Sequence, residues 1–271
     1  MRDMESRQQQ PSDLLGVDGL EKSFGGIRAL QGLTFGVPRG AIKAVIGPNG
    51  AGKTTLFNLV TGILLPTRGT ISLNGETISG RRPQEIARLG VSRTFQNVNL
   101  FGRMTVLENV MVGRHARSQA GVLSAGLRLP WMRREEEEIR ARALEQLEFV
   151  GLADRARERA GNLPLGEQKL LEVARALATE PQILLLDEPA GGLNTRETER
   201  LGELIRRIRG QAITVVLVEH DMNLVMEVSD DIVVVSFGQK IAEGKPREIK
   251  RNPAVIEAYL GEEGDYENRK S

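Results

Sequence analysis

The feature that most constrains this chain is a loop that fits the pattern G-x-x-x-x-G-K-[ST], with Gly-Pro-Asn-Gly-Ala-Gly-Lys-Thr over residues 47–54. An apolar run at residues 41–46 precedes the loop, and residues 54–61 follow it with a helical pattern. Glycines let successive backbone N–H groups point inward at an anion, and the start of the helix adds positive potential. The pattern predicts a strand, a phosphate-binding loop and a helix, in that order.

The residue types in this loop suit a nucleotide that carries a divalent metal ion. The positively charged Lys53 ammonium group would contact the β and γ phosphates, and the Thr54 hydroxyl could ligate Mg²⁺. The residues expected to contact the nucleotide are Asn49, Gly50, Ala51, Gly52, Lys53, Thr54 and Thr55. The alternative is a glycine turn with an exposed lysine, which the flanking strand and helix disfavour.

A second group of candidate residues lies at the end of an apolar run. Residues 183–189 are Ile-Leu-Leu-Leu-Asp-Glu-Pro, so the run ends in the acids Asp187 and Glu188. In an open parallel sheet, ligands bind at the carboxyl ends of the strands. We expect Asp187 to hold Mg²⁺ through water and Glu188 to act as the general base that polarises the attacking water. An ordinary acidic turn is the alternative.

Two further polar side chains follow apolar runs and would reach the same edge of the sheet. His220 follows the run at 212–218, and Gln96 follows the run at 91–95. We expect His220 to contact the γ-phosphate and the water, and the Gln96 amide to reach Mg²⁺ or the water. A lone histidine is more often structural, so this prediction depends on the neighbouring motifs.

The alternation of apolar runs with helical patterns predicts an α/β fold with a mainly parallel sheet. The expected strands are at residues 41–46, 91–95, 183–186, 212–218 and 232–237. Glycine turns at Gly75 and Gly238 predict added antiparallel strands.

One helix is predicted in detail. Residues 195–209 carry an apolar stripe at helical spacing, Asn194 and Glu197 form an N-cap pair, and Gly210 would end the helix.

The stretch from about residue 100 to 179 has helical patterns and no convincing strand. Within it, the apolar residues of 121–132 predict either a small satellite core or a docking patch for a partner. The expected organisation is a tail at 1–12, one domain at 13–260 and a second tail at 261–271. The domain would consist of an α/β core at 13–98 and 180–248, a helical subdomain at about 99–179 and C-terminal helices at 246–260.

Composition excludes several classes of function. The chain has no cysteine and two histidines, which excludes disulfides, cysteine nucleophiles and a histidine-rich zinc site. Its net charge of +1 offers no global attraction to nucleic acid or anionic lipid. No apolar run approaches the roughly 18 residues of a membrane span. We therefore expect a cytosolic protein that meets a membrane only through a partner.

In chain order, these residues resemble the ATP-binding subunits of ABC transporters. The resemblance rests on residues 47–54, Gln96, 163–168, Asp187 with Glu188, 190–194 and His220. It implies a P-loop NTPase fold with an inserted helical subdomain, ATP and Mg²⁺ as cofactors, and coupling of hydrolysis to transport. Phe24 stands where the family places an aromatic side chain that stacks on adenine.

The signature segment departs from the family pattern, which is usually Leu-Ser-Gly-Gly-Gln. Residues 163–169 are Leu-Pro-Leu-Gly-Glu-Gln-Lys, so Pro164 replaces the serine that offers a hydroxyl to the γ-phosphate. The resemblance implies that Pro164, Gly166 and Glu167 would face the ATP of a partner subunit. Proline has neither a hydroxyl nor an N–H donor. We therefore expect slower hydrolysis at the partner's site and unequal sites if the partner has the serine.

A closer resemblance is to the importers of branched-chain amino acids. It is carried by residues 93–96, 100–101, 104–109, 187–194 and 252–261. It implies two ATPase subunits that sandwich two ATP molecules, most often as a heterodimer, although a homodimer is possible. Further partners would be two membrane permease subunits and, indirectly, a solute-binding protein, with this chain on the cytoplasmic side of the membrane and no nucleic acid bound.

Two other functions stay open at this point. An ATPase for urea or for lipid export would share the fold, and the tail at 252–261 favours import. A nucleotide-switched regulatory module with little hydrolysis would fit Pro164, whereas Glu188 and His220 argue against it.

Overall fold

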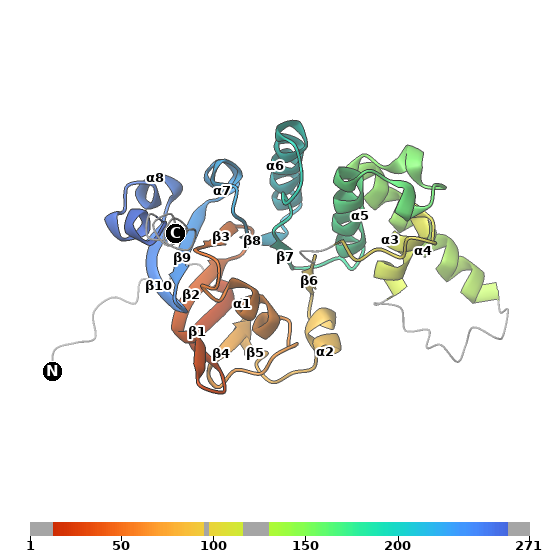
Figure 1. The fold of residues 1–271 in the computed structure, drawn as a ribbon. Coiled ribbons are helices and arrows are strands. Elements are labelled where there is room, and N and C mark those ends of the chain that lie inside the picture. The colour runs from red at the N-terminus through yellow and green to blue at the C-terminus, as the bar shows by residue number, and fades with distance from the viewer. Residues whose placement is uncertain (1–12, 95–97, 116–129, 260–271) are drawn as a thin grey trace.

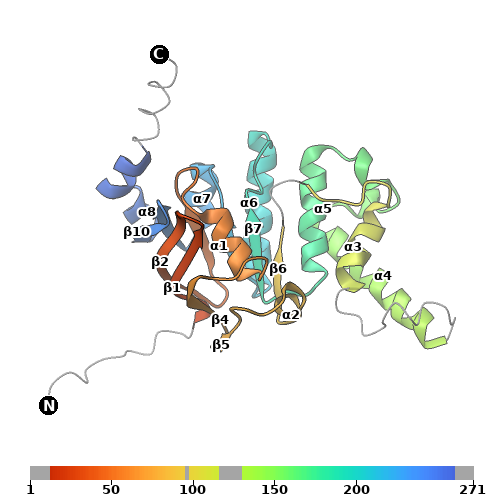
Figure 2. The same ribbon diagram turned by 60° about the horizontal axis from the view of Figure 1, so that its bottom comes forward.

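The computed structural model describes residues 13–94, 98–115 and 130–259, which form two sheets and a set of helices (Figure 1). The smaller sheet has the strand order β2-β1-β4-β5 and the larger has the order β10-β9-β3-β8-β7-β6. Helix α1 (Lys53–Val60) lies between the two sheets, where Leu56 and Phe57 are buried against both (Figure 2).

The larger sheet confirms the predicted α/β fold. β6 (Val91–Arg93), β7 (Ile183–Asp187), β8 (Thr214–Val218), β3 (Ile42–Ile46) and β9 (Asp231–Ser236) are parallel neighbours, and β10 (Gln239–Gly244) pairs antiparallel with β9. Every residue of β3, β7 and β8 is buried, which explains their continuous apolar sequences. Because these strands run in parallel, the residues that follow their carboxyl ends meet at one edge.

Several strand ends differ from the predictions. The run at 91–95 is a strand only as far as Arg93. β8 begins at Thr214 because Ala212 turns with a φ of +60°. β9 ends at Ser236 because Phe237 and Gly238, at φ +47° and +77°, make the predicted turn into β10. In the last two cases the apolar run extends beyond the ladder into a turn.

The smaller sheet is antiparallel throughout and consists of β1 (Asp13–Phe24), β2 (Ile27–Pro38), β4 (Arg68–Leu73) and β5 (Glu76–Thr77). The predicted turn at Gly75 joins β4 to β5, with φ values of +52° at Asn74 and +77° at Gly75. The long hairpin of β1 and β2 was not predicted from the sequence. Its register shifts interrupt the alternation of buried and exposed residues that identifies a strand.

The remaining helices of the α/β part are α2 (Pro83–Arg88), α6 (Thr195–Gly210), α7 (Met222–Val228) and α8 (Pro246–Ile249), and residues 253–259 are also helical. The predicted cap of α6 is confirmed. The Asn194 side chain accepts the Glu197 N–H at 3.0 Å, and the Glu197 carboxylate accepts the Asn194 N–H at 2.9 Å. α6 ends at Gly210, one residue beyond the predicted last residue Arg209, and Gln211 is the C-cap.

Three helices gather on one side of the molecule: α3 (Val106–His115), α4 (Pro130–Val150) and α5 (Leu165–Leu177) (Figure 1). Short 3-10 segments at Ala153–Arg155 and Ala160–Asn162 join α4 to α5. Residues 121–129 of the predicted apolar patch lie outside the described residues.

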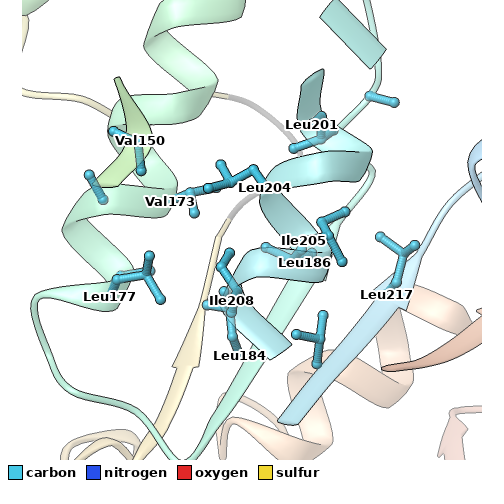
Figure 3. Close-up of a cluster of buried hydrophobic side chains, with 14 of the residues drawn as sticks. Val150, Val173, Leu177, Leu184, Leu186, Leu201, Leu204, Ile205, Ile208 and Leu217 are labelled. Atoms are coloured by element: carbon cyan, nitrogen blue, oxygen red, sulfur yellow. The ribbon is translucent and has the colours of Figure 1, made fainter. Parts of the chain in front are cut away.

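A continuous hydrophobic core joins these helices to the larger sheet through α6 (Figure 3). Val173 and Leu177 of α5 are in the same cluster as Leu204 and Ile208 of α6. That cluster continues to Leu184 and Leu186 of β7, Leu217 of β8 and Val150 of α4. The helix that begins at the signature segment is thus packed, through α6, against the strand that ends at Asp187.

Candidate nucleotide-binding site

The loop between β3 and α1 is formed by glycines in conformations that other residues avoid. The φ values are +151° at Gly47, +79° at Gly50 and +104° at Gly52. A Cβ at Gly47 would overlap the carbonyl oxygen of Val235, and one at Gly52 would come within 2.6 Å of the carbonyl oxygen of Ala29. Close packing therefore requires glycine at Gly47 and Gly52 independently of any ligand.

Lys53 lies inside the curl of this loop. Its Nζ donates to the carbonyl oxygens of Gly47 at 2.6 Å and Pro48 at 2.8 Å, and the residue is 6% exposed. Asn49, Gly50 and Thr54 are exposed beside it. A buried ammonium group next to exposed loop residues and a helix N-terminus fits a phosphate group.

The loop is also held from outside, by the turn between β9 and β10. The N–H of Gly238 donates to the Ala51 carbonyl at 3.1 Å, and the Gln31 side chain donates to the Phe237 carbonyl at 2.7 Å. We predicted Gly238 only as a hairpin turn. The support that it gives the phosphate-binding loop depends on the placement of β9 beside β3, which the sequence pattern does not show.

Asp187 is buried at the end of β7 and paired with an arginine. Its Oδ2 accepts from Arg93 Nη2 of β6 at 2.6 Å, and Arg93 Nη1 donates to the Asn58 side chain of α1 at 2.7 Å. The Arg93 guanidinium also lies 5.4 Å from the centre of the Phe57 ring. Arg93 thus ties β7 to the helix that follows the phosphate-binding loop. Sequence reasoning quoted Arg93 only as part of a family motif and missed this contact.

Glu188 and His220 are brought together as their positions after β7 and β8 predicted. His220 Nε2 lies 2.9 Å from Glu188 Oε1, with side-chain exposures of 41% and 21%. The Glu188 N–H donates to the Val218 carbonyl at 2.8 Å, and Glu188 has a φ of +48°, which is uncommon for a residue with a side chain. A carboxylate and an imidazole in contact at a strand edge can accept and orient a proton.

Two buried charged residues next to this pair were missed by sequence reasoning. Glu219 is 3% exposed, and its carboxylate accepts the N–H groups of Ala190, His220 and Asp221 at 2.6, 2.8 and 3.2 Å. Lys169 of α5 is 8% exposed and donates to the Glu188 carbonyl at 3.1 Å. Burial lowers the pKa of Lys169, and the nearby carboxylates, Glu219 first, oppose that shift. The only available signal was that each is adjacent to a predicted site residue or motif.

The signature segment lies away from the phosphate-binding loop. α5 and α1 are on opposite sides of β7 in both ribbon views (Figures 1 and 2). Pro164 is the exposed N-cap of α5, at φ −56° and ψ 155°, and the helix begins at Leu165. A Cβ at Gly166 would lie 2.6 Å from the Glu197 carboxylate of α6.

Three other predicted site residues are Phe24, Glu167 and Gln96. Phe24 ends β1, is 46% exposed, and has the Lys22 ammonium 5.0 Å from its ring centre. The Glu167 Oε1 atom lies 3.6 Å from Arg155 Nη2. Gln96 lies outside the described residues.

Comparison with known proteins assigns the family. Residues 30–191 match the family described as ABC transporter, and residues 239–265 match the family described as branched-chain amino acid ATP-binding cassette transporter. The chain is 49% identical to the high-affinity branched-chain amino acid transport ATP-binding protein LivG of Salmonella typhimurium, over 92% of this chain and 98% of that protein. The chain is an ATP-binding subunit of the ABC transporter family.

Further relatives of this ATP-binding subunit agree with that assignment. The high-affinity branched-chain amino acid transport ATP-binding protein BraF of Pseudomonas aeruginosa is 48% identical over 92% of this chain and 98% of its own length. A crystal structure of a nucleotide-free ATP-binding cassette from an ABC transporter superposes with a TM-score of 0.81, at 33% identity, covering 92% of this chain and 99% of the other. An ADP conformation of such a cassette gives the same score at 32% identity and the same coverage. The ATP-binding subunit belongs with the LivG and BraF group.

In the described parts of the chain, no helix combines the length and apolar character needed to cross a membrane.

Proposed function

We propose that this subunit hydrolyses ATP to drive uptake of branched-chain or related hydrophobic amino acids. The observation that carries the proposal is the 2.9 Å contact between Glu188 and His220, at the sheet edge where β3 leads into the phosphate-binding loop. Support for the substrate class comes from the LivG and BraF relatives and from the match of residues 239–265.

The residues that would hold Mg²⁺ and ATP are those of the loop and its neighbours. Lys53 and the N–H groups of the loop bind the phosphates, and Phe24 stacks on the adenine. Thr54, Gln96 and Asp187 would hold the metal ion, with Asp187 acting through water because its carboxylate is paired with Arg93. When bound, the ion neutralises phosphate charge. The fit to a phosphate is supported by the buried Lys53 ammonium, which lies beside the exposed residues Asn49, Gly50 and Thr54.

Glu188 is the general base in this scheme. Its carboxylate accepts a proton from the attacking water, whose oxygen forms a bond to the γ-phosphorus while the bond to the ADP oxygen breaks. The products are ADP and phosphate, and the proton is released with them. His220 fixes the orientation of the Glu188 carboxylate through their contact and touches the γ-phosphate. Lys53 stabilises the charge on the phosphate oxygens.

The proposed assembly is the one that the resemblance to branched-chain amino-acid importers implies. Two ATPase subunits, this chain with a different one or with a second copy, would sandwich two ATP molecules. Pro164, Gly166 and Glu167 would then face the partner's ATP. Two permease subunits hold the pair at the cytoplasmic side of the membrane and receive substrate from a solute-binding protein. Closure of the pair would pull on the permease subunits. Gln96 and the helical subdomain at about 99–179 would carry the coupling from the α/β core of 13–98 and 180–248.

Uptake in cells tests this function. The complete transporter is expressed with the wild-type subunit or with Glu188→Gln in a strain that lacks its own copy, and uptake of labelled leucine, isoleucine, valine and urea is followed. We expect uptake of the three amino acids with the wild type and none with the variant. Uptake of urea alone would assign the protein to another substrate, and equal uptake with both forms would contradict the ATPase.

A second candidate is a nucleotide-switched regulatory module, which Pro164 favours because it removes a phosphate-contacting hydroxyl. In that case ATP would close the pair of subunits, and Glu188→Gln would leave the regulated process intact. The same cells separate the two functions, because only the transport function requires the Glu188 carboxylate.

A further inference from the structure

We propose that Lys169 and Glu219 are positioning residues that hold the backbone on either side of Glu188 and His220 and thereby set the rate of hydrolysis. The proposal rests on the proposed ATPase function, in which Glu188 is the base. Neither residue touches the reacting atoms in this scheme. Each contacts the main chain of a residue that does, Glu188 for Lys169 and His220 for Glu219.

Lys169 holds the Glu188 main chain from the side of α5. Its Nζ donates to the Glu188 carbonyl at 3.1 Å, and the Gly191 N–H donates to the same oxygen at 3.2 Å. A Cβ at Gly191 would lie 3.5 Å from that Nζ, so the turn after β7 is packed directly onto the lysine. Glu188 needs such support because its φ of +48° is a disfavoured conformation for a residue with a side chain.

Glu219 holds the same turn from the side of β8. One carboxylate oxygen accepts the Ala190 N–H, and the other accepts the N–H groups of His220 and Asp221. Backbone hydrogen bonds to a carboxylate are about twice as strong as neutral ones. Glu219 therefore joins the residue two positions after Glu188 to the backbone of His220, and it fixes the two loops whose side chains meet at 2.9 Å.

The two residues act on one turn and attract each other. Both are more than nine-tenths buried, and Lys169 experiences the charge of Glu219. Lys169 also belongs to α5, whose N-cap is Pro164 of the signature segment. The helix that would contact the partner's nucleotide therefore contacts the backbone of Glu188 through this lysine.

The test compares two buried lysines. Lys169→Gln removes the charge that supports Glu188, and Lys169→Arg keeps it. Lys43→Gln is the matched control, because Lys43 is 3% exposed, contacts the Gly36 carbonyl at 2.7 Å and pairs with Asp231 and Glu243 away from Glu188. The kcat and KM for MgATP and the midpoint of thermal unfolding are measured on the full chain.

We expect Lys169→Gln to lower kcat by about 10-fold or more, as for loss of a charge-assisted hydrogen bond, with KM for MgATP within about twofold. Lys169→Arg should recover most of kcat. Lys43→Gln should lower the midpoint temperature of thermal unfolding. At temperatures below that unfolding transition, its kcat should equal that of the wild type. An unchanged kcat in Lys169→Gln, or an equal loss in Lys43→Gln, would overturn the proposal. Glu243→Gln replaces the control if Lys43→Gln does not fold.

A second readout does not need turnover. Because the chain has only two histidines, the ring signals of His220 can be followed by NMR in the full chain and assigned with His220→Ala. Glu219→Gln and Lys169→Gln should shift those signals, and Lys43→Gln should not. Unshifted signals would reject the positioning role. The proposed function fails separately, if Glu188→Gln hydrolyses ATP as fast as the wild type.

Discussion

Helices α1 and α5 each begin at a segment whose sequence resembles a phosphate-binding motif. The two N-termini differ in backbone conformation and in burial. α1 begins after Gly52, at φ +104°, and Lys53 is buried in the curl of the preceding loop. α5 begins after Pro164, at φ −56°, which is exposed and offers no side-chain hydrogen bond. The first beginning is packed against strand backbone, whereas Gly166 in the second faces the side chain of Glu197.

The difference separates what the chain does for its own nucleotide from what it offers to another. The start of α1 combines glycine backbone, a buried charge and a helix N-terminus in one place. The start of α5 has only the helix N-terminus and its glycine, because Pro164 lacks both a hydroxyl and an N–H. We therefore expect changes at α1 to abolish function in this chain, and changes at α5 to adjust the rate at a partner's site.

The largest effect should follow from removing the charge at α1. Lys53→Ala is expected to lower MgATP hydrolysis by at least about 100-fold, because the buried ammonium is a preorganised charge at the phosphates. Hydrolysis is measured by phosphate release, and Lys240→Ala, at an exposed lysine, is the control. Activity above a tenth of the wild type would show that the loop is not the phosphate site.

A pair of glycine substitutions tests the packing contrast directly. Gly52→Ala should lower the free energy of unfolding by about 2–4 kcal/mol, since its Cβ would meet the Ala29 carbonyl at a positive φ. Gly166→Ala should cost about 1 kcal/mol or less, because the Glu197 side chain can move. Urea unfolding of both variants gives the comparison, and equal losses would contradict the account.

Replacing Pro164 at the N-terminus of α5 with the serine of the family pattern tests the difference between α5 and α1. Pro164→Ser supplies a hydroxyl and an N–H, so hydrolysis by the assembled pair of subunits should rise by about 10-fold. The affinity of this chain's own site for ATP should not change. Phosphate release at saturating MgATP measures the first effect and nucleotide titration the second. A rate equal to that of the wild type would count against the role assigned to Pro164.

The N-terminus of α6, to which no phosphate contact is assigned, provides a control for the stability changes at α1 and α5. Asn194→Ala removes the side chain that caps α6 and should lower the free energy of unfolding by about 1 kcal/mol. Asn194→Asp keeps the acceptor and should retain most of the stability. Urea unfolding reports both values. A loss for the alanine variant no larger than for the aspartate variant would contradict the cap.

The smallest effect concerns a carboxyl within α5. Glu172 is 4% exposed and accepts the Asn99 N–H at 2.7 Å. Burial raises the pKa of Glu172, whereas that hydrogen bond and the charges of Arg175 and Lys169 oppose the shift. A carboxyl with a raised pKa binds its proton more tightly in the folded state, so ionised Glu172 lowers stability above its folded pKa.

Glu172→Gln removes that pH-dependent cost. Its free energy of unfolding relative to the wild type should therefore be highest near pH 7 and should decline as the pH falls toward 4.5, the ordinary value for this group. Urea unfolding of both proteins at several pH values measures the difference. A difference that grows on acidification would reverse the assigned sign.

The sequence predicted the features that arise from local pattern. Buried parallel strands such as β7 are continuous apolar runs, and the loop before Lys53 requires glycine for packing as well as for a ligand. Glu188 and His220 were expected at one edge of the sheet because both follow parallel strands, and the structure brings them into contact there. In these cases the local sequence pattern is enough to predict where the residues lie in the fold.

The features that were missed depend on elements that are distant in the chain. Arg93 meets Asp187 only because β6 lies beside β7, and Lys169 meets Glu188 only because α5 packs over the turn that follows β7. No spacing or periodicity marks either contact. The hairpin of β1 and β2 was missed for a local reason, since its register shifts remove the alternation on which recognition of a strand depends.

The most direct test of the central claim is hydrolysis of MgATP by the purified full chain, compared with Glu188→Gln, while dimer formation is followed by light scattering. We predict phosphate release by the wild type and a loss of at least about 100-fold in the variant, which still binds ATP and stays dimeric with it. Equal rates of hydrolysis in the two proteins would contradict the account. Tight ATP binding with no hydrolysis in either would show that the Pro164 signature cannot serve a pair of identical subunits, and the same comparison would then be made with a partner ATPase.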